Sequence, residues 1–282
     1  MPTDVKDIRI NERIRIGGKN PLVLIGGPCV IENRDHAFSM ARKISAICQD
    51  LKVPYIFKAS YDKANRSSLK SFRGPGLKEG LQILSDIKQE LAVPVLSDIH
   101  ETGHIQAAAE VLDIIQIPAF LCRQTDLIIT AARTQRPLNI KKGPFMSPYE
   151  VKNIVEKVTD QGNENIILTE RGTTFGYGNL VFDIRSIPIM KELGFPVVID
   201  ASHSVQYPGG EGHSSGGDAC FIPFIARAGI SVGCDGIFCE IHDNPSKALS
   251  DKRNSLNLND LRIFLEGLLK LRSAVDEINS LV

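Results

Sequence analysis

Four residues that lie far apart in the sequence carry side chains that bind transition metals. They are Cys29, His203, Glu240 and Asp251. One sulfur, one imidazole nitrogen and carboxylate oxygens suit zinc, iron(II) or manganese(II), because magnesium and calcium rarely recruit a thiolate. Cys29 could equally be an inert core thiol, half of a disulfide or a nucleophile. The metal interpretation therefore requires a fold that brings the four residues together.

A second set of residues is cationic. Its members are Lys58, Lys63, Arg66, Lys141, Lys142 and Arg171. Lysine ammonium groups bind phosphates and carboxylates, and arginine adds a planar fork that can hold two oxygens at once. This set therefore suits a phosphate- and carboxylate-bearing ligand.

Most of these residues lie at or just beyond the end of a short apolar segment. Eight such segments have the near-continuous Val, Ile and Leu of buried parallel strands, and the chain between them is long enough for helices. The predicted strands are 22–29, 55–60, 94–100, 114–118, 137–142, 165–171, 196–203 and 236–242. Eight strand–helix units in 282 residues predict a (β/α)8 TIM barrel, and a doubly wound sheet is the structural alternative.

The rest of the chain fits a single barrel domain over residues 1–282. The alternating stretch within residues 3–18 predicts an N-terminal β-hairpin that caps the bottom of the barrel. Ser147-Pro148-Tyr149-Glu150 predicts a capping box, followed by a helix that ends at Gly162. The glycine-rich segment 209–217 follows a strand end, where we expect a mobile active-site loop.

The barrel prediction places the polar residues at one end of the molecule. Alternate strand residues point inward, and active sites form where the strands end. Counting back in twos from each predicted strand end gives the inward residues Gly27, Cys29, Lys58, Ser60, Asp98, His100, Gln116, Asn139, Lys141, Thr169, Arg171, Ala201, His203, Glu240 and His242. Burying so many polar groups without partners or a ligand is unfavourable, so the pattern predicts an active site.

The composition is that of an ordinary globular protein. It is 43% hydrophobic, and its 33 basic and 33 acidic side chains give no broad charge for nucleic acid or an anionic membrane. No apolar stretch approaches the roughly 20 residues of a membrane helix, and the N-terminus lacks the apolar core of a signal peptide. We therefore expect a cytoplasmic protein whose six cysteines stay reduced, which argues against a disulfide at Cys29.

One pattern match misleads. The segment His100-Glu101-Thr102-Gly103-His104 fits the zinc-protease string H-E-x-x-H, which needs both histidines on one helical face. His100 ends a predicted strand, so we do not expect a protease. His100 and His242 are instead candidates to orient the ligand His203 without binding the metal themselves.

Eight segments that together span nearly the whole chain closely resemble the 3-deoxy-D-manno-octulosonate 8-phosphate synthase family. They are GPCVIE, FKASYDKANRSS, FRGPGL, IIQIPAFLCRQTDL, NIKKGPF, TERGTTFGYGNLVFD, DASHSVQ and ALSD. The family's members are homotetrameric (β/α)8 barrels that condense phosphoenolpyruvate with D-arabinose 5-phosphate in lipopolysaccharide synthesis. The resemblance implies the same transferase activity here.

The resemblance also implies roles for individual residues. It implies that phosphoenolpyruvate is bound by Lys58, Lys63, Gln116, Lys141 and Arg171. It implies that arabinose 5-phosphate is bound by Asn65, Arg66, Ser67, Asp98 and, from a neighbouring subunit, Arg123. Members with cysteine at the position of Cys29 depend on a metal, which implies the ligands Cys29, His203, Glu240 and Asp251. The implied catalytic residues are Lys58, Lys63, Lys141, His203 and Asp251.

Three alternative functions share this fold. The nearest is a 3-deoxy-D-arabino-heptulosonate 7-phosphate synthase, which uses erythrose 4-phosphate. The ANRSS segment argues against it, because that family resembles Lys-Pro-Arg-Thr at the aldose-binding position. The others are a metal-dependent hydrolase, whose turnover would not need phosphoenolpyruvate, and a barrel that binds sugar phosphates without catalysis.

Overall fold

The computed structural model describes residues 5–64, 66, 68–175, 178–208 and 216–281. Within these residues, eight parallel strands pair in the order β11-β8-β7-β6-β5-β4-β3-β14, and β11 pairs with β14 to close a barrel. The strands are β3 (Val23–Gly27), β4 (Tyr55–Lys58), β5 (Val95–Asp98), β6 (Ile114–Ile117), β7 (Leu138–Lys141), β8 (Ile166–Glu170), β11 (Val197–Asp200) and β14 (Gly236–His242). Each lies within a predicted segment. The TIM barrel is confirmed, and the doubly wound alternative is wrong.

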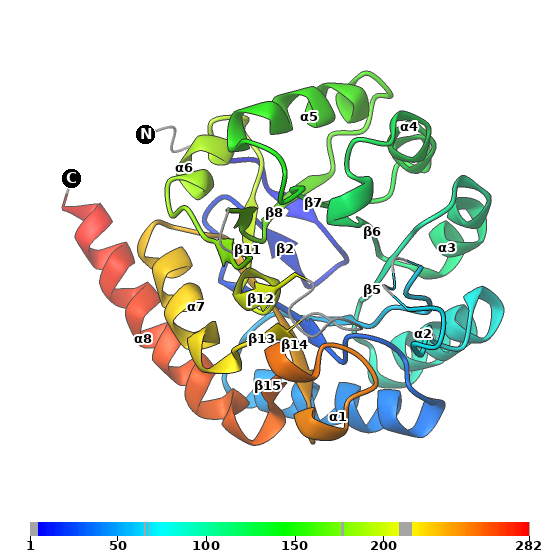
Figure 1. The fold of residues 1–282 in the computed structure, drawn as a ribbon. Coiled ribbons are helices and arrows are strands. Elements are labelled where there is room, and N and C mark those ends of the chain that lie inside the picture. The colour runs from blue at the N-terminus through cyan, green and yellow to red at the C-terminus, as the bar shows by residue number, and fades with distance from the viewer. Residues whose placement is uncertain (1–4, 65, 67, 176–177, 209–215, 282) are drawn as a thin grey trace.

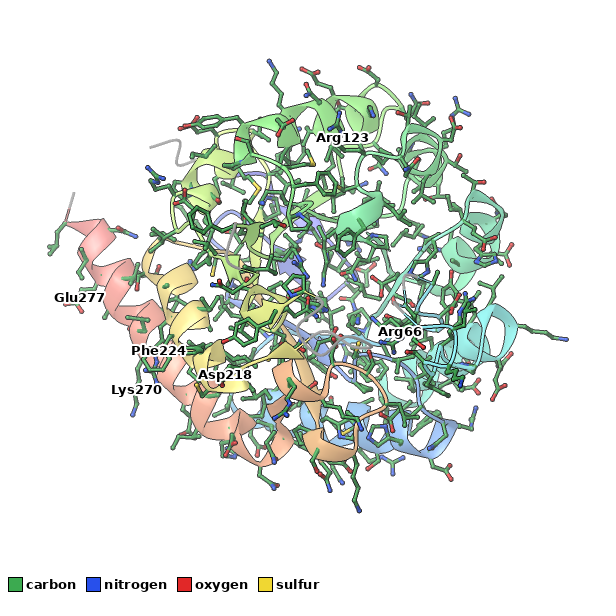
Figure 2. The ribbon with its side chains drawn as sticks, in the orientation of Figure 1. Arg66, Arg123, Asp218, Phe224, Lys270 and Glu277 are labelled. Carbon is green, nitrogen blue, oxygen red and sulfur yellow. The ribbon has the colours of Figure 1, made fainter. Side chains whose placement is uncertain are left out.

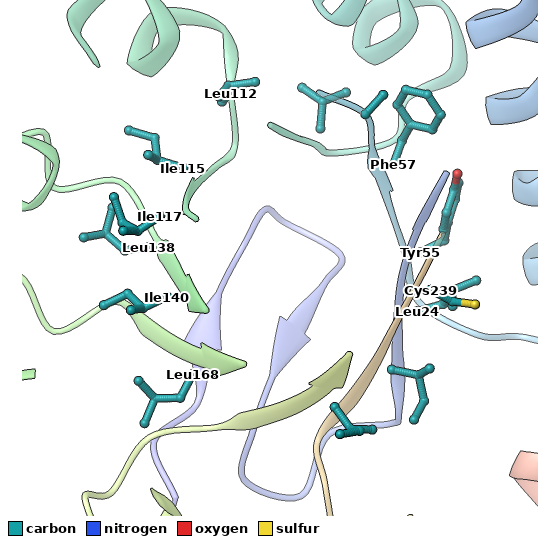
Figure 3. Packing of buried hydrophobic residues seen from close by; sticks show 14 of the residues in the cluster. Leu24, Tyr55, Phe57, Leu112, Ile115, Ile117, Leu138, Ile140, Leu168 and Cys239 are labelled. Atoms are coloured by element: carbon teal, nitrogen blue, oxygen red, sulfur yellow. The ribbon is translucent and has the colours of Figure 1, made fainter. Parts of the chain in front are cut away.

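Helices surround the barrel, as Figure 1 shows in a view along its axis. They are α1 (Arg34–Asp50), α2 (Leu77–Leu91), α3 (Ile105–Val111), α4 (Thr125–Arg133), α5 (Val151–Thr159), α6 (Ser186–Lys191), α7 (Ile222–Ser231) and α8 (Leu261–Ser280). Their apolar faces pack on outward strand residues such as Leu24, Phe57 and Ile115 (Figure 3). Among the described residues, no helix has the length and apolar character needed to cross a membrane.

The N-terminal hairpin closes the bottom of the barrel, as predicted. Strands β1 (Ile8–Arg9) and β2 (Arg15–Ile16) pair antiparallel, with Ile8 opposite Ile16. The hairpin residues Ile8, Ile10 and Ile16 are buried. They form one cluster with the inward residues Val23, Ile25, Ile56, Leu96, Ile114, Ile167, Val198 and Phe238.

Short paired strands lie at the opposite end of the barrel, where the barrel strands have their C-terminal ends. They are β9 (Thr173–Thr174) with β10 (Leu180–Val181), β12 (Gln206–Tyr207) with β13 (Gly216–Gly217), and β15 (Leu256–Asn257) beside β14. Most of the segment predicted as a mobile loop, 209–215, lies outside the described residues.

The predicted helix start at Ser147 is confirmed. The Ser147 side chain accepts the Tyr149 N–H, and Glu150 closes the capping box around a short 3-10 turn that leads into α5. The helix itself ends at Thr159, three residues before Gly162, because the chain leaves it through a turn in which Gly162 takes a φ of 73°.

The predicted alternation holds in seven of the barrel strands within the described residues and is wrong in β11. That strand ends at Asp200, and Val198 points inward, so Asp200 also points inward. Ala201, predicted to be inward, packs in the outer core among residues that face the helices. His203 reaches the barrel mouth from a 3-10 turn, His203–Val205, that follows the strand.

Candidate active site

A chain of hydrogen bonds crosses the C-terminal ends of four neighbouring strands. Thr169 Oγ1 donates to Asn139 Oδ1 at 2.6 Å, and Asn139 Nδ2 donates to Gln116 Oε1 at 2.7 Å. Gln116 Nε2 donates in turn to Asp98. Each strand from β5 to β8 supplies one predicted inward residue. The hydrogen bonds fix the orientation of the side-chain amides of Gln116 and Asn139, because each amide nitrogen donates and each amide oxygen accepts. These side chains form an ordered polar floor.

Two lysines lie on one side of this floor. Lys58 is buried, and its Nζ lies 2.9 Å from Glu240 Oε1 and 3.0 Å from the Cys29 carbonyl oxygen. Lys63 Nζ lies 3.7 Å from Asp98 Oδ2. Burial opposes the charge on Lys63, but interactions with Cys29 and with the carboxylates of Asp98, Glu240 and Asp251 outweigh it and raise its pKa. Lys63 is therefore held as a cation.

Lys141 and Arg171 are buried cations on the other side, and their charges are less completely balanced. Lys141 Nζ lies 2.6 Å from Asp200 Oδ2 and 3.7 Å from the ring centroid of Phe238. Arg171 Nη2 donates to Gln206 Oε1 at 2.7 Å. Burial lowers the pKa of both groups in spite of nearby carboxylates. An anion bound beside them would offset that burial.

Lys142 does not belong to this site. Its buried ammonium donates to the Met146 carbonyl at 3.2 Å and to Thr173 Oγ1 at 3.1 Å, and it lies 3.5 Å from Glu170 Oε1. Its cationic neighbour Lys141 points inward, so Lys142 points to the outer side of β7. Its partners are therefore structural.

The four candidate metal ligands meet at the mouth of the barrel. Ligand atoms of Cys29, Glu240 and Asp251 all lie within 4.8 Å of one another. His203 Nε2 lies 3.7 Å from Glu240 Oε1 and 3.6 Å from Asp251 Oδ2. Strands β3 and β14 end beside each other and bring Cys29 to Glu240, while loops bring the other two residues.

Three features of this cluster fit a divalent cation. Glu240 Oε2 is buried and has no hydrogen-bond partner among the described residues. Burial, followed by the charge of Asp251, raises the pKa of the Cys29 thiol to about 12, so its thiolate needs added positive charge. His203 Nδ1 lies 2.7 Å from Asp200 Oδ2, which holds the proton on Nδ1 and leaves the Nε2 lone pair facing two carboxylates.

Asp200 and Gln206 are site residues that sequence reasoning missed. Asp200, rather than His100 or His242, supports His203, and starting the alternation from inward Val198 would have found it. Gln206 Nε2 donates to Asp251 Oδ1 at 3.1 Å while its oxygen accepts from Arg171. Gln206 thus joins the cationic side to the ligand cluster, and no periodic pattern marks it.

The residues expected to bind the sugar phosphate are only partly placed. Asn65 and Ser67 lie outside the described residues. Arg66 Nε donates to the Phe72 carbonyl at 3.0 Å, and its Nη2 is buried with no partner among the residues described. Arg123 is exposed on the loop before α4, and Figure 2 shows it well separated from Arg66. One chain therefore does not bring these two arginines together.

The comparisons with known proteins agree over almost the whole chain. Residues 5–277 match the model of the DAHP synthetase I family. The chain is 56% identical over 265 residues to a 2-dehydro-3-deoxyphosphooctonate aldolase of Geobacter sulfurreducens, covering 94% of this chain and 96% of that protein. It is 55% identical over 274 residues to the protein of that name in Geotalea uraniireducens, covering 97% and 99%. A Cyanothece protein of that name is 53% identical over 268 residues, covering 95% and 98%.

Proposed function

The chain belongs to the DAHP synthetase I family, and from this premise we propose that it is a 3-deoxy-D-manno-octulosonate 8-phosphate synthase. The proposed transferase condenses phosphoenolpyruvate, D-arabinose 5-phosphate and water, and releases phosphate. The name that the relatives carry, 2-dehydro-3-deoxyphosphooctonate aldolase, supports this activity. The reaction belongs to lipopolysaccharide synthesis, and we expect it in the cytoplasm.

One observation carries the proposal most directly: buried and partly buried cations lie beside a sulfur, nitrogen and carboxylate cluster at the barrel mouth. The cations are Lys58, Lys63, Lys141 and Arg171, and the carboxylates are Asp98, Asp200, Glu240 and Asp251. The formal charges of the two sets cancel. Binding two phosphorylated substrates therefore calls for further positive charge, which a divalent metal and additional arginines can supply.

Phosphoenolpyruvate fits the cationic side. The incompletely balanced charges of Lys141 and Arg171 suit its phosphate and carboxylate. Lys58, Lys63 and Gln116 complete the proposed set. Glu240 and Asp98 hold these side chains in fixed directions, so that the enol carbon presents one face to the aldehyde.

The sugar phosphate is proposed to bind between Arg66 and Arg123 of a neighbouring subunit. The unpartnered Nη2 of Arg66 supports this placement, and Asn65 and Ser67 belong to the proposed set. Asp98 would accept hydrogen bonds from the sugar hydroxyls as an ionised carboxylate, because neighbouring Lys63 and Lys58 outweigh burial and hold its pKa well below the usual range. The separation of the two arginines in one chain supports a homo-oligomer, and we propose a tetramer.

Cys29, His203, Glu240 and Asp251 are the proposed ligands of one divalent metal, which we expect to be zinc, iron(II) or manganese(II). When bound there, the metal would polarise the aldehyde oxygen or activate the attacking water. The protein's own contribution is positional. Asp200 holds the Nδ1 proton of His203, and Gln206 fixes one oxygen of Asp251.

The proposed chemistry balances without a covalent enzyme intermediate. Carbon 3 of phosphoenolpyruvate bonds to the aldehyde carbon, whose oxygen takes up a proton. Water adds to carbon 2 and loses a proton, and the resulting hemiketal phosphate expels phosphate by carbon–oxygen cleavage. Lys58, Lys63, Lys141, His203 and Asp251 are the proposed catalytic residues. Lysine cations near the phosphate stabilise the charge that develops as it leaves.

The test measures phosphate release from phosphoenolpyruvate with arabinose 5-phosphate, before and after chelation and after adding back single metals. Chelation should abolish turnover, and zinc, iron(II) or manganese(II) should restore it. Water labelled with oxygen-18 should leave the label in the sugar product. Label in the released phosphate would contradict the cleavage step, and full activity without detectable metal would contradict the ligand assignment.

The description of the matching family names one second candidate, a synthase that takes erythrose 4-phosphate. Parallel assays with the two aldoses decide between them. Faster phosphate release with erythrose 4-phosphate would replace the proposed substrate, although the relatives' printed name favours the eight-carbon product.

A further inference from the structure

Glu32 lies on the turn between β3 and α1, with only 14% of its side chain exposed. Its Oε1 accepts the backbone N–H of Leu249 at 2.7 Å and lies 3.2 Å from Nε2 of His242. The two partners are more than 200 positions away along the chain. One carboxylate oxygen therefore holds together three segments that the barrel brings to the same place.

These three segments carry three of the four proposed metal ligands. They are residues 29–32, 240–242 and 249–251. The first begins with Cys29, the second begins with Glu240 and the third ends with Asp251. Glu32 itself lies outside the ligand set, so its contacts act on the positions of the ligands.

The backbone of Asp251 shows why its loop needs such a hold. Asp251 has a φ of 52° and a ψ of 38°, in the left-handed region that residues with a Cβ seldom occupy. After it, the Asn254 N–H and the Ser255 hydroxyl donate to its carbonyl at 3.2 and 2.9 Å. Before it, the Leu249 N–H donates to Glu32. The loop is thus fixed on both sides of the ligand.

The ligand atoms of Glu32, His36 and His242 also lie within 4.8 Å of one another, which raises the possibility of a second metal site. The hydrogen bonds argue against it. The Asn244 N–H donates to His242 Nδ1 at 2.9 Å, which places the ring proton on Nε2, where it is donated to Glu32. Asp243 Oδ1 lies 3.1 Å from the same Nδ1 but has its own donor in His36 Nε2 at 3.2 Å.

We propose that Glu32 is a positioning residue for the metal centre. Glu32 holds the loop of Asp251 against the strand ends that carry Cys29 and Glu240. The inference rests on the proposed function, because it requires that the four ligands bind a metal. Groups that orient metal ligands typically contribute 10- to 100-fold to metal affinity. The metal site should therefore weaken when Glu32 loses its acceptor oxygen.

The experiment compares wild type with Glu32→Ala, Glu32→Gln and the control His36→Gln. Cobalt(II) is titrated against a chromophoric chelator, and the thiolate-to-cobalt absorption band is followed. Glu32→Ala should bind cobalt about 10- to 100-fold more weakly, and its kcat should recover at saturating metal with an unchanged KM for phosphoenolpyruvate. Glu32→Gln keeps an acceptor oxygen and should bind nearly as wild type. His36→Gln leaves the hydrogen bond from Leu249 to Glu32 in place and should match wild type.

The outcomes separate the two proposals. Wild type that is active without binding cobalt would defeat the metal assignment itself. Wild-type binding with equal affinity in Glu32→Ala would overturn only the positioning role. A second equivalent of cobalt that is lost in His36→Gln would show that the histidine cluster binds metal and would also overturn it. If Glu32→Ala does not fold, Glu32→Asp, whose shorter side chain weakens the same contacts, supplies the affinity measurement.

Discussion

The N-terminal end of the barrel is filled with apolar side chains, whereas the C-terminal end of the same strands is polar. On one strand the change is from Phe238 to Glu240, and on others it is from Ile56 to Lys58 and from Val198 to Asp200. Each change spans two residues, roughly 7 Å along a strand. Packing and chemistry are therefore separated along the barrel axis, although both use inward positions.

The difference teaches where stability and activity each reside. The hairpin and the inward apolar residues bury surface without any polar partner to satisfy. The other end holds cations whose pKa is lowered by burial and an orphaned carboxylate oxygen, which a bound ligand would compensate. Substitutions at the polar end should therefore mainly lower activity, and substitutions at the apolar end should mainly lower stability.

The largest effect should come from Arg171→Ala, at the polar end. Loss of a buried cation that is proposed to bind phosphoenolpyruvate should lower kcat/KM about 100- to 1,000-fold, about 3 to 4 kcal/mol. Steady-state kinetics measure kcat/KM, and thermal unfolding measures the stability of the variant. Lys152→Ala, on the exposed face of α5, is the matched control. A variant that lost stability but kept its activity would reverse the assignment of the two ends.

The next effect should come from Ile16→Ala, in the hairpin plug. Ile16 is fully buried, and the cavity should lower the free energy of unfolding by about 2 to 4 kcal/mol while kcat stays unchanged in the folded protein. Denaturant unfolding followed by an assay well below the melting temperature checks both. Ile263→Ala, on exposed α8, should cost little. A loss of kcat in folded protein would show that the plug shapes the active site.

A smaller effect should follow from Asp200→Asn. The neutral amide no longer balances Lys141 or enforces the Nδ1 proton of His203, so metal affinity should fall about 10- to 100-fold. Competition with a chelator measures it. The exposed Asp276→Asn on α8 serves for comparison. Unchanged affinity would mean that the orientation of His203 depends on other contacts.

The smallest effect concerns pH and His100. Burial lowers the pKa of His100, and its Nδ1 has no partner among the described residues. Below about pH 6.5 the unfolded chain binds this proton more readily, so stability falls as the pH falls, by at most about 1.4 kcal/mol per pH unit. Stability measured between about pH 5 and 7 should depend less on pH in His100→Gln. Ile16→Ala should keep the wild-type slope, and identical slopes in all three proteins would exclude this role for His100.

The sequence by itself determined the barrel and most of the site. Near-continuous apolar segments with Lys58, Asp98, Gln116 and Lys141 one or two residues before their predicted ends marked the strands and their polar ends, because strand alternation is a local property. The meeting of Cys29 with Glu240 also followed from the rule that parallel strands end on one face, whereas Asp251 joins them from a loop. The single-domain boundary and the substrate roles stay predictions.

The tertiary structure alone decided the contacts that depend on where a strand ends and how a loop returns. Asp200 was missed because β11 stops three residues before its predicted end, which shifts the inward parity by one. Gln206 and Glu32 meet the ligand loop through hydrogen bonds between residues 45 and 217 positions apart. Such contacts leave no periodic trace in the sequence, because they arise only when the closed barrel brings separate loops together.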